Sequence, residues 1–111
     1  MIDLRAYKET VVAAVARERE ADKNWSWSLK AVNKTVIRIG WGYLDYIGEK
    51  APFTVEASEE DDGKVIVIGT IPNGRKIYWL VDPKNCQCYG TIKEAIAGVI
   101  HRMACSAHNT Y

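Results

Sequence analysis

The residues best suited to chemistry gather in one stretch of the chain. All three cysteines and both histidines lie between residues 85 and 108. They are Cys86, Cys88, His101, Cys105 and His108. Thiolate sulfur and imidazole nitrogen are the usual ligands of structural zinc. The order of these residues is that of a zinc site, except that one residue instead of two separates the first two cysteines. The first question is therefore whether this segment holds a metal ion.

Helix geometry argues against a metal here. Thr91 and Glu94 have the spacing of a capping box, which predicts a helix from Thr91 to about Cys105. The cysteine pair then precedes the helix, whereas His101 lies about 15 Å further along its axis. Zinc needs all four ligands within about 2.3 Å of one ion. We therefore expect neither a metal nor another cofactor. The five residues stand only as a minor candidate, of which His101, Cys105 and His108 could still form a partial surface site.

A thiol and a base also come together on this helix. His101 and Cys105 are four residues apart, so their side chains share one face and could touch. The sequence indicates no third group that would orient the histidine, and the last turn of a helix is a poor place for preorganised chemistry. The chain also lacks a nucleophile elbow, a P-loop and a paired-histidine metal motif. We therefore expect a protein that is not an enzyme.

Composition bounds the class of protein. The 111 residues are 48% hydrophobic and 26% charged, which is typical of one soluble globular domain spanning residues 1–111. No apolar run approaches the roughly 18 residues that a membrane span needs. Asp3 and Glu9 lie inside an amphipathic pattern that does not fit a signal peptide, and an odd number of cysteines favours reduced thiols. We expect a cytoplasmic protein that does not bind membranes.

Hydrophobic periodicity predicts the elements that position these residues. A helical repeat covers residues 4–20, and period-two or continuous apolar runs follow before the second helix. The expected strands cover residues 25–30, 35–47, 53–57, 64–70 and 75–81. Asn73-Gly74 predicts a two-residue hairpin turn between the last two of them. The order predicts a two-layer α+β fold, in which an N-terminal and a C-terminal helix cover one face of an antiparallel meander of about five strands.

Charge is unevenly distributed along the chain. The net charge is only +1, but residues 45–62 hold seven acidic side chains against one lysine, a local balance of −6. A compact acidic loop can steer a basic partner protein. The strand with Gly40 and Gly42 adds aromatic side chains and two places where the backbone can bend or be approached closely. The residues that we predict to bind a partner are Trp41, Tyr43, Glu59, Glu60, Asp61 and Asp62.

Nucleic-acid binding is the alternative. Tryptophans and tyrosines lie on predicted strands, where exposed rings can stack bases; those considered are Trp25, Trp27, Trp41, Tyr43, Tyr78 and Trp79. Basic residues nearby could form a rim, and the candidates for this alternative are Arg38, Trp41, Arg75 and Lys76. Aromatic residues are also favoured in the cores of small sheets, and a sequence pI of about 7.7 is low for a dedicated nucleic-acid domain.

The leading hypothesis is a small non-enzymatic protein that binds and modulates a partner protein, as inhibitors, immunity proteins and phage or mobile-element accessory proteins do. Helices on one face would leave the other face of the sheet open. An apolar strand such as residues 64–70 would place hydrophobic side chains on that open face. A homodimer is also compatible with this hypothesis.

Overall fold

The computed structural model describes residues 2–43, 46–47, 52–82 and 91–110. A 3₁₀ turn, η1 (Leu4–Tyr7), leads into the first helix, five main strands and a short arm follow, and a long helix closes the chain. The other elements are α1 (Lys8–Ala21), β1 (Trp25–Val32), β2 (Val36–Tyr43), β3 (Tyr46–Ile47), β4 (Phe53–Glu59), β5 (Val65–Thr70), β6 (Lys76–Val81) and α3 (Ile92–Thr110).

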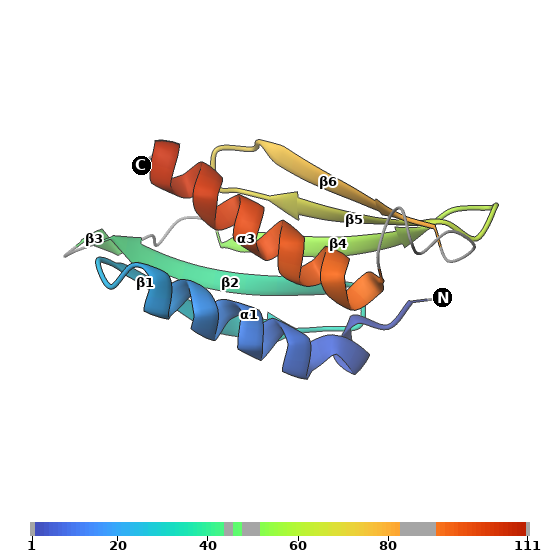
Figure 1. Ribbon diagram of the computed structural model, residues 1–111, viewed down its shortest axis with the longest axis horizontal. Helices are drawn as coiled ribbons and strands as arrows, with labels where there is room; N and C mark the ends of the chain where they lie inside the picture. Colours follow the sequence, from blue (N-terminus) through green and yellow to red (C-terminus); the bar gives the residue numbers. More distant parts are fainter. Residues whose placement is uncertain (1, 44–45, 48–51, 83–90, 111) are drawn as a thin grey trace.

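The sheet confirms the expected antiparallel meander. Its strand order is β1-β2-β4-β5-β6, every pair is antiparallel, and the short arm β3 pairs with β2. Helices α1 and α3 lie side by side on one face, with α1 over β1 and α3 over β5 and β6 (Figure 1). The α+β two-layer fold predicted from the sequence is therefore present, and β1 and β6 are its edge strands.

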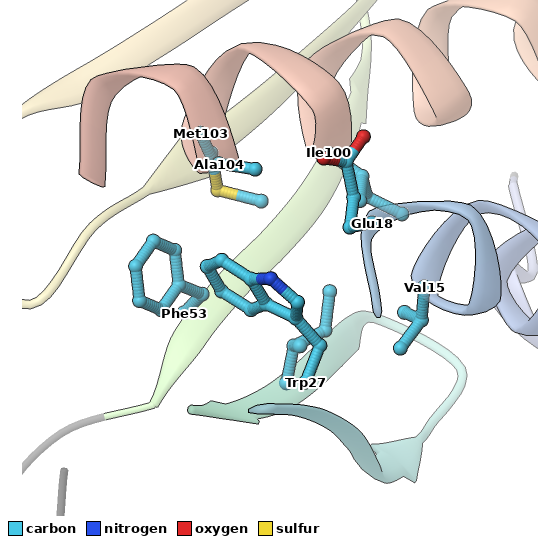
Figure 2. A pocket seen from close by; sticks show the side chains of 8 residues that line it. Val15, Glu18, Trp27, Phe53, Ile100, Met103 and Ala104 are labelled. Carbon is cyan, nitrogen blue, oxygen red and sulfur yellow. The ribbon is translucent and has the colours of Figure 1, made fainter. Parts of the chain in front are cut away.

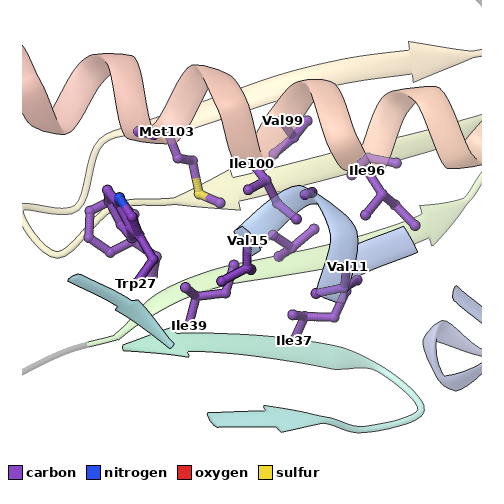
Figure 3. Close-up of a cluster of buried hydrophobic side chains, with 14 of the residues drawn as sticks. Val11, Val15, Trp27, Ile37, Ile39, Ile96, Val99, Ile100 and Met103 are labelled. Carbon is purple, nitrogen blue, oxygen red and sulfur yellow. The ribbon is translucent and has the colours of Figure 1, made fainter. Parts of the chain in front are cut away.

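The core fills the space between the two helices and the sheet. Apolar residues on the inner stripes of the helices meet the inward-facing residues of the strands (Figure 3). Val11 and Val15 of α1 and Ile96 of α3 are almost fully buried there. Tryptophan rings from β1 and β2 complete one end of the core, where the Trp27 ring stands edge-on to Phe53 with the centroids 5.1 Å apart. Each ring removes a large apolar area from water, so this layer supplies much of the stability of the fold.

Two local predictions have different outcomes. The Thr91 hydroxyl accepts the Glu94 backbone N–H at 3.2 Å, which confirms the predicted cap of α3. The prediction of a two-residue hairpin turn is wrong, because three residues separate Ile71 from Arg75. The Gly74 N–H donates to the Ile71 carbonyl at 2.9 Å. Pro72 suits the first central position of such a turn, and Gly74, with φ 93°, takes the left-handed position that ends it.

Close packing explains two of the glycines. Gly40 faces the side of the sheet away from the helices, where the Lys30 side chain crosses directly over it and the Ser28 hydroxyl lies close by. The irregularity in register lies in β1, between Leu29 and Ala31, and not in the glycine-bearing strand β2. Gly98 of α3 faces the Trp79 ring of β6, so this small residue serves packing within the chain.

Candidate functional site

The face of the sheet opposite the helices is the first candidate surface. Strand registers arrange its side chains in three rows, of which two run across β2, β4, β5 and β6 and the third runs across β4, β5 and β6. The first row is Arg38, Thr54, Thr70 and Lys76, the second is Val36, Glu56, Ile68 and Tyr78, and the third is Ser58, Ile66 and Leu80. We call this surface the open face. The first row places basic side chains at one end of the open face. The second and third rows become apolar toward β6.

Four side chains form an apolar patch on the open face. Ile66 pairs with Leu80 and Ile68 pairs with Tyr78 across the β5–β6 ladder, so the four form one contiguous cluster. Tyr78 is 59% exposed and Leu80 is 37% exposed. These are two of the three exposed large hydrophobic residues among the described residues, the third being Val12 on α1. A clustered apolar surface of this kind indicates an interaction site more strongly than scattered hydrophobic residues do.

The acidic loop lies at the end of the apolar patch. It leaves β4 at Glu59 and returns at Val65, which pairs with Val81, the residue after Leu80. The loop is an ordered turn in which the Glu60 N–H donates to the Lys64 carbonyl at 2.7 Å. The Lys64 ammonium contacts the Asp62 carboxylate at 3.2 Å, and the Lys64 backbone N–H hydrogen bond lowers the pKa of that carboxyl. Glu59, Glu60, Asp61 and Asp62 are all exposed, so the loop keeps a net negative charge.

The structure separates the predicted partner-binding residues into two groups. Trp41 is buried on the helix-covered face, where its ring packs with those of Trp25 and Phe53. Tyr43 is half-buried and also contacts Trp25, at the end of β2 far from the acidic loop. The loop and these two aromatic residues therefore do not form one surface, and Trp41 has no ring face to offer a partner.

The nucleic-acid candidates are also divided. Arg38 and Lys76 are both exposed and stand at opposite ends of the first row of the open face. Arg75 instead reaches toward the helices, where its guanidinium lies 3.4 Å from the Ser106 hydroxyl of α3. The rings of Trp25 and Trp27 lie in the core. In the part of the chain that the structure describes, the indole rings therefore form no stacking platform on the open face.

The described cysteine and histidine residues do not converge on one site. Cys86 and Cys88 lie outside the described residues. His108 stacks against the Trp25 ring with the centroids 5.1 Å apart, whereas His101 contacts Cys105 at 3.5 Å. Among the residues that the structure describes, no three His, Cys, Asp or Glu side chains are grouped so that they could hold a metal ion.

Sequence reasoning missed a third member of the His101–Cys105 pair. Glu18 of α1 lies across the helix–helix contact, and its carboxylate is 2.8 Å from His101 Nδ1. Glu18 is only 7% exposed and is the buried charged residue of the described chain. A signal was present, because Glu18 follows Val11, Ala14 and Val15 on the inward-facing stripe of α1. A carboxylate at the next position of a buried stripe needs a partner, and His101 is that partner.

Glu18 also borders a small hollow under the two helices (Figure 2). Val15, Trp27 and Met103 contribute to its otherwise apolar wall. The Trp27 indole N–H is buried and has no hydrogen-bond partner among the described residues. The hollow belongs to the core and is too small for an organic ligand, so it does not compete with the open face as a binding site.

Comparison with known proteins adds no further information on function. No protein-family model, no curated protein and no solved structure matches this chain. Within the described residues, neither helix combines the length and the apolar character that crossing a membrane would require.

Proposed function

We propose that this chain is a small non-enzymatic binding protein that docks onto a partner protein through its open sheet face. The observation that carries the proposal is the apolar patch of Ile66, Ile68, Tyr78 and Leu80 on the face that no helix covers. Tyrosine is among the residues that contribute most at protein interfaces, because it buries a large area and loses little side-chain entropy. Tyr78 is the natural anchor of such an interface.

Charge indicates the kind of partner. The acidic loop adjoins the apolar patch at one end, and the row with Arg38 and Lys76 adjoins it at the other. A complementary surface would be apolar at its centre, basic opposite the loop and acidic opposite the basic row. Such complementarity increases the rate of association and the specificity for the partner more than it increases affinity.

The same charges count against nucleic acid as the occupant. A phosphate backbone laid along the open face would meet the four carboxylates of the acidic loop. It would find Tyr78 exposed, but it would not find the indole rings of β1 and β2, which lie in the core. The proposal therefore names a protein.

The test compares two matched charge insertions at exposed apolar positions. Leu80→Glu places a charge in the apolar patch, and Val12→Glu places one on the outer side of α1, where the native residue is 46% exposed. Both variants and the wild type are used as bait in host lysate with and without nuclease treatment, and their oligomeric state is measured by size-exclusion chromatography with light scattering. We expect Leu80→Glu to lose a partner that Val12→Glu retains.

Three outcomes would contradict the proposal. Partners that disappear with nuclease would identify nucleic acid as the occupant. A wild-type dimer that Leu80→Glu converts to a monomer would identify a second copy of the chain as the occupant. Equal capture by the two variants would show that the apolar patch is not the binding surface.

A further inference from the structure

A second site lies on the helical side of the molecule, away from the open face. The His101 ring stands between two partners: its Nε2 is 3.5 Å from Cys105 Sγ, and its Nδ1 is 2.8 Å from Glu18 Oε1. Cys105 and His101 come from α3, whereas Glu18 comes from α1, 83 positions away in the sequence. The order thiol, imidazole, carboxylate is that of an activated nucleophile with its base and the group that orients the base.

Burial gives the carboxylate a defined role. The Glu18 side chain is held in the contact between the two helices, while the side chain of His101 is 64% exposed. A carboxylate that accepts the Nδ1–H fixes the neutral ring in the tautomer whose Nε2 lone pair faces the thiol. Nε2 is then free to take the proton of Cys105. Glu18 is thus a positioning residue that acts through His101.

We propose that Cys105 is an activated thiol that undergoes exchange with small disulfides and is thereby a modification site. The Cys105 proton moves from Sγ to His101 Nε2, and the thiolate attacks one sulfur of the disulfide. A bond forms between Cys105 Sγ and that sulfur as the original S–S bond breaks. The departing thiolate takes the proton back from Nε2. Cys105 is oxidised to a mixed disulfide, half of the reagent is reduced to a thiol, and no other reactant is needed.

The surroundings select this chemistry over acyl transfer. Cys105 lies in the last two turns of α3, where backbone N–H groups are used inside the helix and the free groups nearby are carbonyls. Within the described part of this helix end, no backbone N–H group is left free for a tetrahedral oxyanion, although acyl transfer depends on such donors. In disulfide exchange the developing charge stays on sulfur. The thiol is exposed, so a small disulfide can approach without a shaped pocket.

The experiment follows the rate at which each cysteine forms a mixed disulfide with hydroxyethyl disulfide at neutral pH. Remaining thiols are blocked with N-ethylmaleimide, and trypsin then releases residues 103–111 with Cys105 and residues 85–93 with the other two cysteines. Mass spectrometry of the two peptides separates the sites. We expect His101→Gln to slow modification of Cys105 about tenfold, which is below the roughly 10²–10⁴-fold typical of a positioned base because the site is exposed. His108→Gln, one further histidine on the same helix, is the matched control and should leave the rate unchanged.

Glu18→Gln tests the positioning role, with Glu20→Gln, an exposed residue of α1, as its matched control. We expect Glu18→Gln to slow modification of Cys105 by up to about tenfold, the low end for loss of a group that orients a histidine. Long-range ¹H–¹⁵N spectra of the His101 ring should show the proton on Nδ1 in the wild type and a loss of that preference in Glu18→Gln. A purely structural contact would not change the tautomer of a ring that is otherwise in place.

The proposal is overturned if His101→Gln reacts as fast as the wild type. It is also overturned if Glu18→Gln keeps both the wild-type rate and the Nδ1 proton. Thermal unfolding followed by circular dichroism accompanies each variant, since a buried amide at position 18 lowers stability if it leaves a hydrogen bond unmade. Should Glu18→Gln not fold, the exposed His101→Gln variant decides the outcome alone.

Discussion

Gly98 of α3 offers a direct test of the packing between α3 and β6. A Cβ built on Gly98 would lie within 2.9 Å of three atoms of the Trp79 ring. A face of that ring is occupied too, because the Arg102 guanidinium, one helical turn after Gly98, lies over it at 4.7 Å from its centroid. The indole is rigid, so a methyl group at position 98 displaces the ring instead of bending it.

Two opposing effects decide the stability of Gly98→Ala. Alanine in a helix interior is favoured over glycine by about 1 kcal/mol. Overpacking costs about 1–3 kcal/mol, and a displaced ring also loses about 0.5–1 kcal/mol of its interaction with the guanidinium. We expect the steric effect to win, with a net loss of about 1–2 kcal/mol. For a domain of this size, that lowers the midpoint of thermal unfolding by about 4–8 °C.

The assay is urea unfolding followed by far-UV circular dichroism. It compares the four proteins of a double-mutant cycle: the wild type, Gly98→Ala, Trp79→Leu and the double variant. In the background Trp79→Leu the ring is absent, so Gly98→Ala should become stabilising by up to about 1 kcal/mol. Ala13→Gly, at an exposed position of α1, calibrates the helix-propensity effect in the same protein. Our reasoning is refuted if Gly98→Ala is as stable as the wild type, or if its effect is the same in both backgrounds.

Three further outcomes follow from the structure. Hydrogen bonds from the Arg5 side chain lower the pKa of Asp3 from 3.8 to about 2. The ionised Asp3 carboxylate therefore stabilises the fold fully above about pH 4, and this contribution is lost as the pH falls through 2. A carboxyl titration by NMR that returns an ordinary pKa for Asp3 would contradict this. Thr91→Ala should cost about 1 kcal/mol in urea unfolding, and Thr91→Ser almost nothing, since the serine keeps the hydroxyl that caps α3. Replacing the four acidic residues 59–62 with lysine should slow association with the proposed partner and flatten its salt dependence, and unchanged kinetics would remove the loop from the binding surface.

Local sequence patterns predicted the fold well because most of its determinants are local. Period-two alternation placed Ile37, Ile39 and Trp41 on one face of β2, and that face is the buried one. The capping box located the start of α3 because its hydrogen bond spans only three residues. The prediction of the hairpin turn failed because it considered Asn73-Gly74 without Pro72. The fixed φ of Pro72 shifts the turn by one residue.

The candidate sites were harder to predict because they depend on contacts between distant elements. Alternation shows which residues share a face of a strand, but not which face the helices cover, so Trp41 was expected at a binding surface and lies in the core. The apolar patch depends on the register between β5 and β6, which no single strand contains. Glu18 and His101 meet only when α1 docks beside α3.

The order of strands in the sheet also has a consequence for folding kinetics. Each main strand pairs with the next main strand along the chain, so the sheet can grow by a series of short loop closures. Low sequence separation between contacts favours fast folding. The contact between α1 and α3 is the exception, because it joins segments from opposite ends of the described chain. Docking of these helices therefore closes the longest loop, and we expect it to be the late step, with hydrogen exchange in α1 faster than in the central strands β4 and β5.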